Sequence, residues 1–277
     1  MSYKTVLAHW DDTDAPRASL EQAGQIARAW DAHLTIYAFG LEPDIAAYSY
    51  GAPGVAVVAQ ESERARADAA EKRAAAEAWL AASGLRGEVR ATRAPLGLLG
   101  EAMGRAAMRA DLVVCAQPYE GEREEIRVRA LEGALFQAAA PVLVVPPSTA
   151  KAAFPRVMVA WDRSIEALHA LRGALGFLKA AEAVELVLVD PTAESADDEP
   201  GAEIAVMLSR HGVPVTVAQV PSVGKRVGEV LRSRALETGA DLLVMGAYGH
   251  SRLREALIGG PTREILEHVP VPVLMAH

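Results

Sequence analysis

The stretch ADLLVMGA, residues 240–247, decides the fold, because a close copy of it, ADLVVCAQ, stands at residues 110–117. Each stretch is an apolar run without polar alternation, which predicts a strand covered on both faces. A pattern that occurs twice in one chain indicates an internal repeat. We therefore compared the two halves of the sequence outward from these runs.

The similarity extends in both directions. Each half starts with a short β-rich run that ends in Trp-Asp, at residues 10–11 and 161–162, and an amphipathic helix pattern follows. Each half ends on a Pro-Val-Leu run, in APVLVVP and VPVLMAH. The Pro- and Ala-rich segment PPSTAKAAFP between them is typical of a linker. We predict a first domain at residues 1–147, a linker at 148–155 and a second domain at 156–277.

Strand and helix patterns alternate within each half, which indicates an α/β fold with parallel strands and right-handed crossovers. We expect a five-stranded parallel sheet in each half, of order 3-2-1-4-5, flanked by helices. The Ala-rich segment Glu61–Ser83 carries charges of both signs and predicts one of these helices. The two Pro-Val-Leu strands should pair edge to edge and make an internal pseudo-dimer, because unpaired edges invite other chains. Further association of two chains as a homodimer stays open.

Composition excludes several classes of function. With 51% hydrophobic residues the chain can bury a sizeable core, and a net charge of −8 argues against nucleic acid or an anionic membrane as main partner. No apolar run approaches the ~20 residues of a membrane-spanning helix, and the stretch MSYKTVLAHWDD has no apolar core of the kind that signal peptides carry. We expect a cytoplasmic protein. Its single cysteine, Cys115, lies in an apolar run and should be a buried thiol.

The run GAYGHSRLREALIGGPTREIL, residues 246–266, carries the functional signal. Gly246 and Gly249 follow a predicted strand, and Gly259-Gly260 precedes Pro261, which suits the first position of a helix. Glycines let a ligand approach the backbone, and N–H groups at a helix start favour anions. The spacing predicts a loop whose two ends bracket a phosphate. The alternative is purely structural, with a strand-exit turn at one end and a permissive helix cap at the other.

Asp162 ends the first strand pattern of the second half. If the strand order is 3-2-1-4-5, Asp162 and Gly246 flank the switch point of the sheet, where α/β folds bind ligands. The Asp162 carboxylate could then accept hydrogen bonds from an adenine amino group or a ribose hydroxyl. The alternative is that it caps the next helix.

The spacing G-x2-G-x9-G, placed between an ADLLVMG strand and a final PVPVL strand, resembles the universal stress protein family. The whole chain fits two tandem members. The resemblance implies flavodoxin-like (Rossmann-like) domains and a family with an ATP-binding branch and a branch that binds no ATP. Members of the ATP-binding branch carry Ser or Thr after the third glycine, where this chain has Gly260. Thr262 falls on a second hydroxyl position of the family pattern.

The resemblance also implies which residues form the nucleotide site. The Val189 backbone would meet adenine, and His250 and Ser251 would lie near the phosphates. The full set that we predict is Ala160, Asp162, Val189, Gly246, Gly249, His250, Ser251, Gly259, Gly260, Pro261 and Thr262. No residues are predicted to hold a metal on their own.

The first half departs from this pattern. Ala116 and Tyr119 replace the first two glycines, and four glutamates crowd the loop, at positions 120, 122, 124 and 125. Alignment of the last strands puts Val128 and Arg129 opposite Gly259-Gly260. Carboxylates are a poor environment for a polyphosphate. We infer that the first domain has lost standard nucleotide binding.

These patterns predict a stress-response binding module that holds ATP or AMP in its second domain, with Mg²⁺ as a bridge between phosphates. One alternative is a scaffold without nucleotide that acts through contacts with a protein partner, by surfaces such as the Leu41–Gln60 insertion. Another is a slow ATPase in which His250, Asp162 or Glu255 activates water. No Walker A motif, nucleophile elbow or zinc-ligand spacing is present, so the sequence does not indicate a dedicated enzyme.

Overall fold

The computed structural model describes residues 3–10, 16–43, 55–119, 121, 123–138, 140–147, 151, 153–192, 199–249 and 260–277. Several predicted residues lie outside the described ones: Asp11, Glu120, Glu122, His250, Ser251, Glu255 and Gly259. So does the middle of the Leu41–Gln60 insertion.

Both halves alternate strands with helices. The elements of the first half are β1 (Thr5–Trp10), α1 (Pro16–Trp30), β2 (His33–Glu42), α2 (Val55–Ser83), β3 (Gly87–Pro95), α3 (Leu96–Ala107), β4 (Leu112–Ala116), α4 (Glu124–Gln137) and β5 (Val142–Val145). Those of the second half are β6 (Arg156–Ala160), α5 (Ile165–Gly173), α6 (Leu175–Ala180), β7 (Ala183–Val189), α7 (Ala202–Arg210), β8 (Val215–Val220), α8 (Val227–Glu237), β9 (Leu242–Gly246), α9 (Pro261–Glu267) and β10 (Val273–Ala276).

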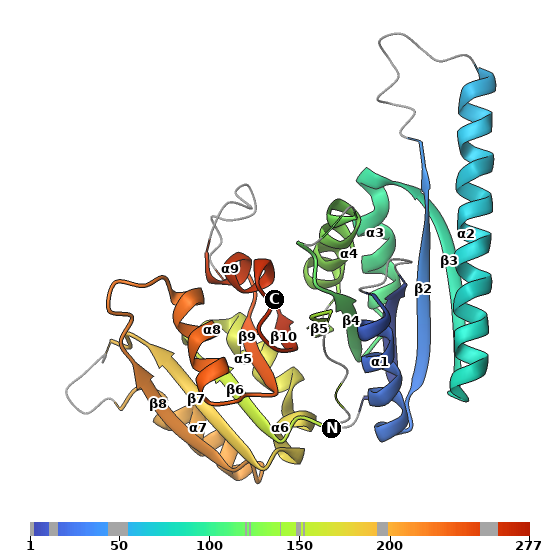
Figure 1. The fold of residues 1–277 in the computed structure, drawn as a ribbon. Helices are drawn as coiled ribbons and strands as arrows, with labels where there is room; N and C mark the ends of the chain where they lie inside the picture. Colours follow the sequence, from blue (N-terminus) through green and yellow to red (C-terminus); the bar gives the residue numbers. More distant parts are fainter. Residues whose placement is uncertain are drawn as a thin grey trace.

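The ten described strands form one sheet of order β3-β2-β1-β4-β5-β10-β9-β6-β7-β8 (Figure 1). All neighbouring pairs within a half are parallel, which confirms the predicted α/β fold. The halves join through β5 and β10, the two Pro-Val-Leu strands, which pair antiparallel with Leu143 opposite Leu274. The pairing that the sequence predicts between these strands therefore makes the sheet continuous across the chain.

Helices cover both faces of the sheet, and the apolar runs form two core layers. Leu243 and Val244 are consecutive and fully buried, yet they belong to opposite layers. This follows from the alternation of side chains along a strand. It also explains why these runs show no polar alternation, since neither face meets water. Cys115 on β4 is buried, as predicted.

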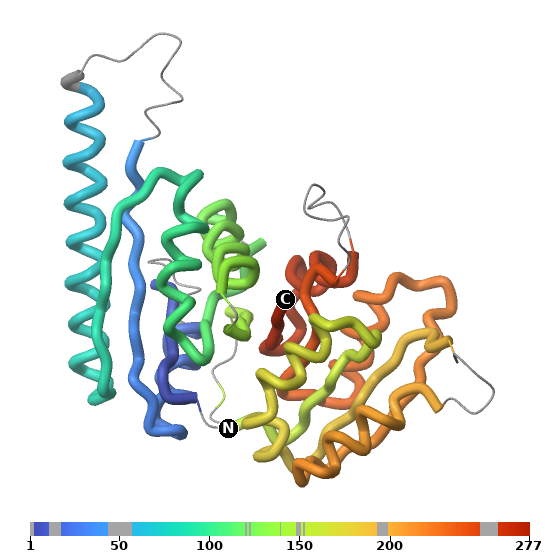
Figure 2. The backbone as a smooth tube through the Cα atoms, turned by 180° about the vertical axis from the view of Figure 1, so that it is seen from behind, coloured from blue at the N-terminus to red at the C-terminus, as the bar shows by residue number. Residues whose placement is uncertain are grey.

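The first half carries a long extension that the second half lacks. Helix α2 has 29 residues and confirms the helix predicted at Glu61–Ser83, whereas its counterpart α7 has nine. One end of helix α2 reaches past the strands and the other helices of the first half (Figures 1 and 2). Buried Lys72 anchors α2, because its Nζ pairs with Asp68 at 2.6 Å and donates to the Phe39 carbonyl oxygen at 3.1 Å. Across the described residues, no helix combines the length and apolar character needed to span a membrane.

Candidate functional site

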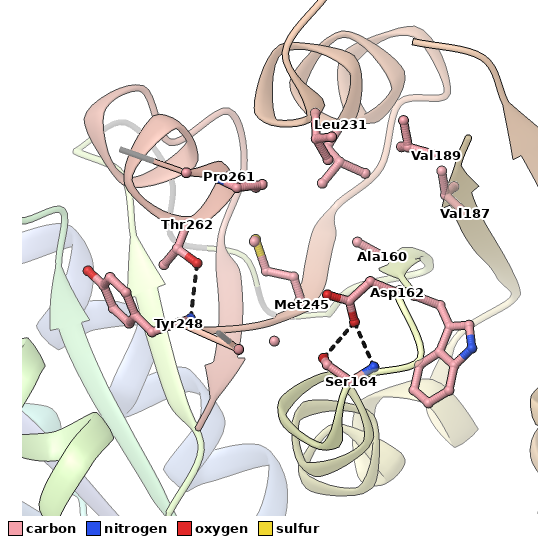
Figure 3. A pocket seen from close by; sticks show the side chains of 15 residues that line it. Ala160, Asp162, Ser164, Val187, Val189, Leu231, Met245, Tyr248, Pro261 and Thr262 are labelled. Atoms are coloured by element: carbon pink, nitrogen blue, oxygen red, sulfur yellow. Dashed lines mark hydrogen bonds between the residues drawn. The ribbon is translucent and has the colours of Figure 1, made fainter. Parts of the chain in front are cut away.

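A cavity of about 280 Å³ opens at the carboxyl ends of β6, β7 and β9 (Figure 3). Strand β6 lies between β9 and β7 in the sheet, so the chain leaves it to one side and later returns on the other. This is the switch point at which open α/β sheets bind ligands. The described lining consists of Ala160, Trp161, Asp162, Ser164, Val187, Val189, Val227, Leu231, Met245, Gly246, Tyr248, Gly249, Gly260, Pro261 and Thr262.

The structure brings together every predicted site residue that it describes. These eight residues all line the cavity: Ala160, Asp162, Val189, Gly246, Gly249, Gly260, Pro261 and Thr262. His250, Ser251 and Gly259 lie outside the described residues. Their role in binding, like that of the other eight, stays a prediction.

Asp162 holds the start of α5 through Ser164. Its Oδ1 accepts hydrogen bonds from the Ser164 backbone N–H at 3.0 Å and from the Ser164 hydroxyl at 2.5 Å. The Ser164 hydroxyl oxygen in turn accepts from the Ala167 N–H at 3.0 Å, so Ser164 is the N-cap of the helix. Among the described residues, none donates to Asp162 Oδ2. The carboxylate therefore still has an oxygen with which to accept a hydrogen bond from a ligand.

The backbone of Val189 is open toward the cavity. The Asp190 N–H bonds to Val220 on β8 at 3.1 Å, and the Trp161 N–H bonds to Val187 at 2.9 Å. Since hydrogen-bonding direction alternates along a strand, the N–H and C=O of Val189 point to the β6 side, beyond the last residue of β6. No described residue pairs with them. They form a donor and an acceptor side by side.

Gly246 and Gly249 differ in what they require. A Cβ on Gly246 would lie 2.6 Å from the Ala167 nitrogen and 2.9 Å from the Glu166 carbonyl carbon, so this glycine lets β9 pack directly on α5. A Cβ on Gly249 would meet only the end of the Glu166 side chain at 3.0 Å and Ser164 Cβ at 3.5 Å. For Gly246, close packing accounts for the glycine, whereas Gly249 lies beside the cavity without such a constraint.

Gly260, at the position where the family pattern has Ser or Thr, has a backbone conformation that favours glycine. It is the N-cap of α9 with φ of 113°, in the left-handed region that favours glycine. Thr262, two residues later, is buried and its Oγ1 accepts the Tyr248 N–H at 3.2 Å. The hydroxyl thus ties the turn after β9 to the start of α9, and its own proton remains available to donate.

Sequence reasoning missed the apolar walls of the cavity. Val187 lies two residues before Val189 on β7 and shares its face, and Val227 and Leu231 are four apart on α8. Met245 completes this surface from β9. The i, i+2 spacing on the strand and the i, i+4 spacing on the helix could have indicated these walls. Apolar residues that pack in an ordinary buried core have the same spacings, so the sequence does not distinguish the two.

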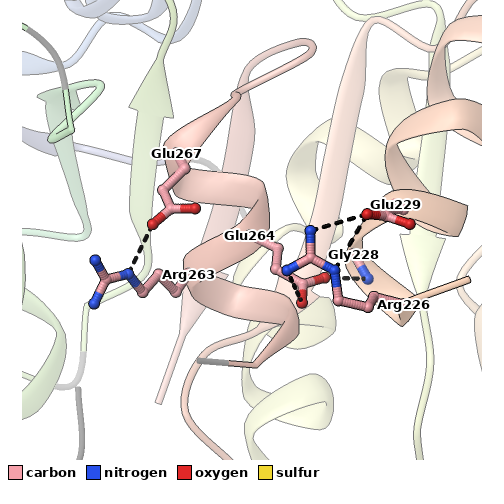
Figure 4. Close-up of polar contacts among 6 residues, drawn as sticks. All are labelled: Arg226, Gly228, Glu229, Arg263, Glu264 and Glu267. Carbon is pink, nitrogen blue, oxygen red and sulfur yellow. Dashed lines mark hydrogen bonds and ion pairs between the residues drawn. The ribbon is translucent and has the colours of Figure 1, made fainter. Parts of the chain in front are cut away.

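An ion-pair cluster joins α8 to α9 beside the cavity (Figure 4). Glu264 Oε2 accepts the Gly228 N–H at 3.1 Å, and Glu264 Oε1 lies 3.2 Å from Arg226 Nη1. Arg226 also donates to Glu229 at 2.9 Å, a bond that raises the pKa of the guanidinium and lowers that of the carboxyl. Because Val227 and Pro261 start these helices, the cluster fixes two walls of the cavity.

The corresponding part of the first half is built differently. Helix α4 has 14 residues and begins at Glu124, whereas α9 has seven. Val128 and Arg129, which the alignment puts opposite Gly259-Gly260, lie inside α4 rather than at a helix start. The extra turns of α4 cover positions that precede α9 in the second half. The described part of this loop therefore lacks the glycine-capped helix start of the second half.

The family model for the universal stress protein family matches residues 153–277. The second half of the chain is thus similar to members of the universal stress protein family. A universal stress protein of Synechocystis is 47% identical over 38 residues, which cover 14% of this chain and 13% of that protein. The family match starts close to the predicted second domain, although the domain boundaries themselves stay a prediction.

Solved structures extend the likeness to both halves. A universal stress protein from Archaeoglobus fulgidus matches with a TM-score of 0.70 and 19% identity, over 100% of this chain and 96% of that one. A putative universal stress protein from Pseudomonas aeruginosa matches with a TM-score of 0.55 and 16% identity, over 99% and 92% of the two chains. At these identities the likeness shows the fold, and that fold is consistent with a tandem arrangement.

Proposed function

We propose that the second domain binds an adenine nucleotide, ATP or AMP, and that the protein acts as a stress-response binding module. One observation carries the proposal: at the switch point of the sheet, a single cavity combines apolar walls with a few convergent polar groups. Small-molecule sites have this composition, with typical volumes of about 300–1,000 Å³. The described lining alone encloses about 280 Å³, next to that range.

The base would lie against the apolar walls. Val187, Leu231 and Met245 offer flat contact for an adenine ring. The open N–H and C=O of Val189 match the neighbouring acceptor and donor on the Watson–Crick edge of adenine. The Asp162 carboxylate could accept from a ribose hydroxyl, since its Oδ2 is not used by the described residues.

The phosphates would extend toward Gly249, Gly260 and Thr262. Thr262 lies across the cavity from Asp162 and Val189 (Figure 3). Backbone N–H groups at the glycines and the Thr262 hydroxyl are donors for phosphate oxygens, and they need no net positive charge on the protein. The family resemblance would add His250, Ser251 and Gly259 to this end of the site.

Mg²⁺ would come with the nucleotide rather than with the protein. Among the described lining residues, Asp162 supplies the sole carboxylate, and no described group of three His, Cys, Asp or Glu residues could hold a metal. A Mg²⁺ ion would therefore take most of its ligands from phosphate and water.

Calorimetric titration of the ligand-stripped protein with ATP and with AMP, with and without Mg²⁺, tests the proposal. We expect micromolar binding at one site per chain, lost in Gly249→Leu and weakened in Asp162→Ala. Gly97→Leu is the matched control, because a Cβ at Gly97 meets open space on α3. The absence of heat for every ligand would contradict nucleotide binding and favour the scaffold alternative. Phosphate release from ATP, compared with Asp162→Ala, tests the slow ATPase alternative.

A further inference from the structure

Tyr248 connects the cavity to the first half of the chain. Its backbone lines the cavity, between Gly246 and Gly249, while its side chain points away from it toward the first half (Figure 3). There its ring centroid lies 5.2 Å from that of Phe136 on α4. Its backbone φ of 58° is in the left-handed region, which a tyrosine keeps only where its surroundings hold it.

Tyr119 of the first half is the second contact. The Tyr119 and Tyr248 side chains are close enough that each affects the pKa of the other. In the repeat alignment Tyr119 stands where the second half has Gly249, so the first half has a tyrosine in place of a ligand-loop glycine. Burial raises the pKa of both hydroxyls, which keeps them neutral.

Further contacts surround this pair. The Arg263 guanidinium of α9 lies 5.4 Å from the Tyr119 ring centroid, and Gln117 Nε2 donates to the Glu267 carbonyl oxygen at 3.3 Å. His277 Nδ1 donates to the Ala247 carbonyl oxygen at 3.0 Å, and its ring meets Phe136 edge-on at 4.9 Å. The segment after β4 therefore contacts both ends of the predicted ligand loop, the turn after β9 and helix α9.

We infer that Tyr119 and Phe136 of the first domain hold Tyr248, and with it the turn Gly246–Gly249, in the conformation that the second-domain site requires. Tyr119 and Phe136 are then positioning residues. The first domain supports the site in this way, although the described lining of the cavity comes from the second half. The contacts run from Phe136 to the Tyr248 ring, and from the Tyr248 N–H to Thr262 Oγ1 on the cavity wall. The expected effect on nucleotide affinity rests on the proposed function, whereas the expected effect on the conformation of the turn Gly246–Gly249 does not.

The test uses the full chain with Tyr119→Phe and Phe136→Leu, and with Tyr37→Phe as the control. Tyr37 is a first-half tyrosine on β2 whose ring packs on Phe39 at 4.9 Å, away from the junction. In unliganded protein, hydrogen exchange at the Tyr248 amide should rise about fivefold in Tyr119→Phe, as expected for loss of one ordinary polar contact. Exchange at the core residue Leu186 should not change, which separates a local effect from unfolding.

ATP and AMP titrations give the second readout. Dissociation constants should rise by about the same factor in Tyr119→Phe and Phe136→Leu, and Tyr37→Phe should match the wild type. Unchanged exchange at Tyr248 in both junction variants would overturn the inference, as would faster exchange with unchanged affinity. If the wild type binds no nucleotide, the proposed function fails, and the exchange result alone decides whether the first domain holds the turn.

Discussion

The position that a Cβ on Gly246 would occupy lies 2.6 Å from the backbone nitrogen of Ala167, so β9 and the first turn of α5 are in direct backbone contact. This contact places Ser164, the α5 N-cap, beside the end of β9. The glycine that opens the predicted ligand loop is thus first a packing residue. Comparing substitutions at Gly246 with substitutions at Gly249, the next glycine of the motif, separates a structural role from a role in ligand binding.

Gly246→Ala should destabilise the protein by about 1–3 kcal/mol, the usual cost of forcing a methyl group into a packed contact. Gly249→Ala should cost much less, because the nearest atom is the end of the flexible Glu166 side chain. Urea denaturation of both variants, followed by circular dichroism, measures the difference. Equal midpoints for the two variants would show that α5 can shift away from β9 without cost.

Thr262→Val should reduce stability by about 1–3 kcal/mol, because the Tyr248 N–H loses its acceptor in a partly buried setting. Thr262→Ser keeps the hydroxyl and should retain most of that stability. The same urea experiment compares the variants. If Val and Ser behave alike, the hydrogen bond between Thr262 and Tyr248 does not stabilise the fold.

Much of the fold could be predicted because its signals are local. The apolar runs at residues 110–117 and 240–247, the Trp-Asp strand ends and the Ala-rich α2 each carry their own pattern. Parallel pairing and the meeting of β5 with β10 then follow from general rules on connections and edges. The cavity position also followed, since strand ends at a switch point can be read from strand order.

What could not be predicted depends on contacts between distant residues. The sequence around Ser164 does not show whether Ser164 caps the helix with support from Asp162, or merely lies near an Asp162 carboxylate that makes no bond to it. The left-handed backbone at Gly260 is visible only once α9 is placed. The contact of Tyr248 with Phe136 requires the relative placement of two halves, which no local pattern encodes.

Cys115 should react with thiol reagents only when the protein opens. It is buried on β4, and burial raises its pKa to about 12, so both access and thiolate are lacking in the native state. We expect alkylation of native protein at pH 8 to be at least ~100-fold slower than in 8 M urea, because reaction needs an opening of the core. Rapid stoichiometric labelling without denaturant would show that β4 is accessible.

Glu132 on α4 gives the pH prediction. Its Oε1 is buried without a hydrogen-bond partner among the described residues, and burial raises its pKa, although Arg129 at 3.7 Å partly offsets this. A carboxyl whose pKa is higher in the folded state favours folding when protonated. That contribution is present below the unfolded pKa of about 4.3 and is lost as pH rises through the folded pKa.

Glu132→Gln should therefore gain stability relative to wild type between pH 4 and pH 7, because the amide carries no charge to bury. Loss of the Arg129 pair should matter little, since Arg129 is largely exposed. Glu77→Gln is the control, because Glu77 pairs with Arg73 on the exposed face of α2. Urea denaturation of each protein at both pH values gives the comparison. A difference between Glu132→Gln and wild type that is the same at pH 4 and pH 7 would mean that burial of this carboxylate does not oppose folding.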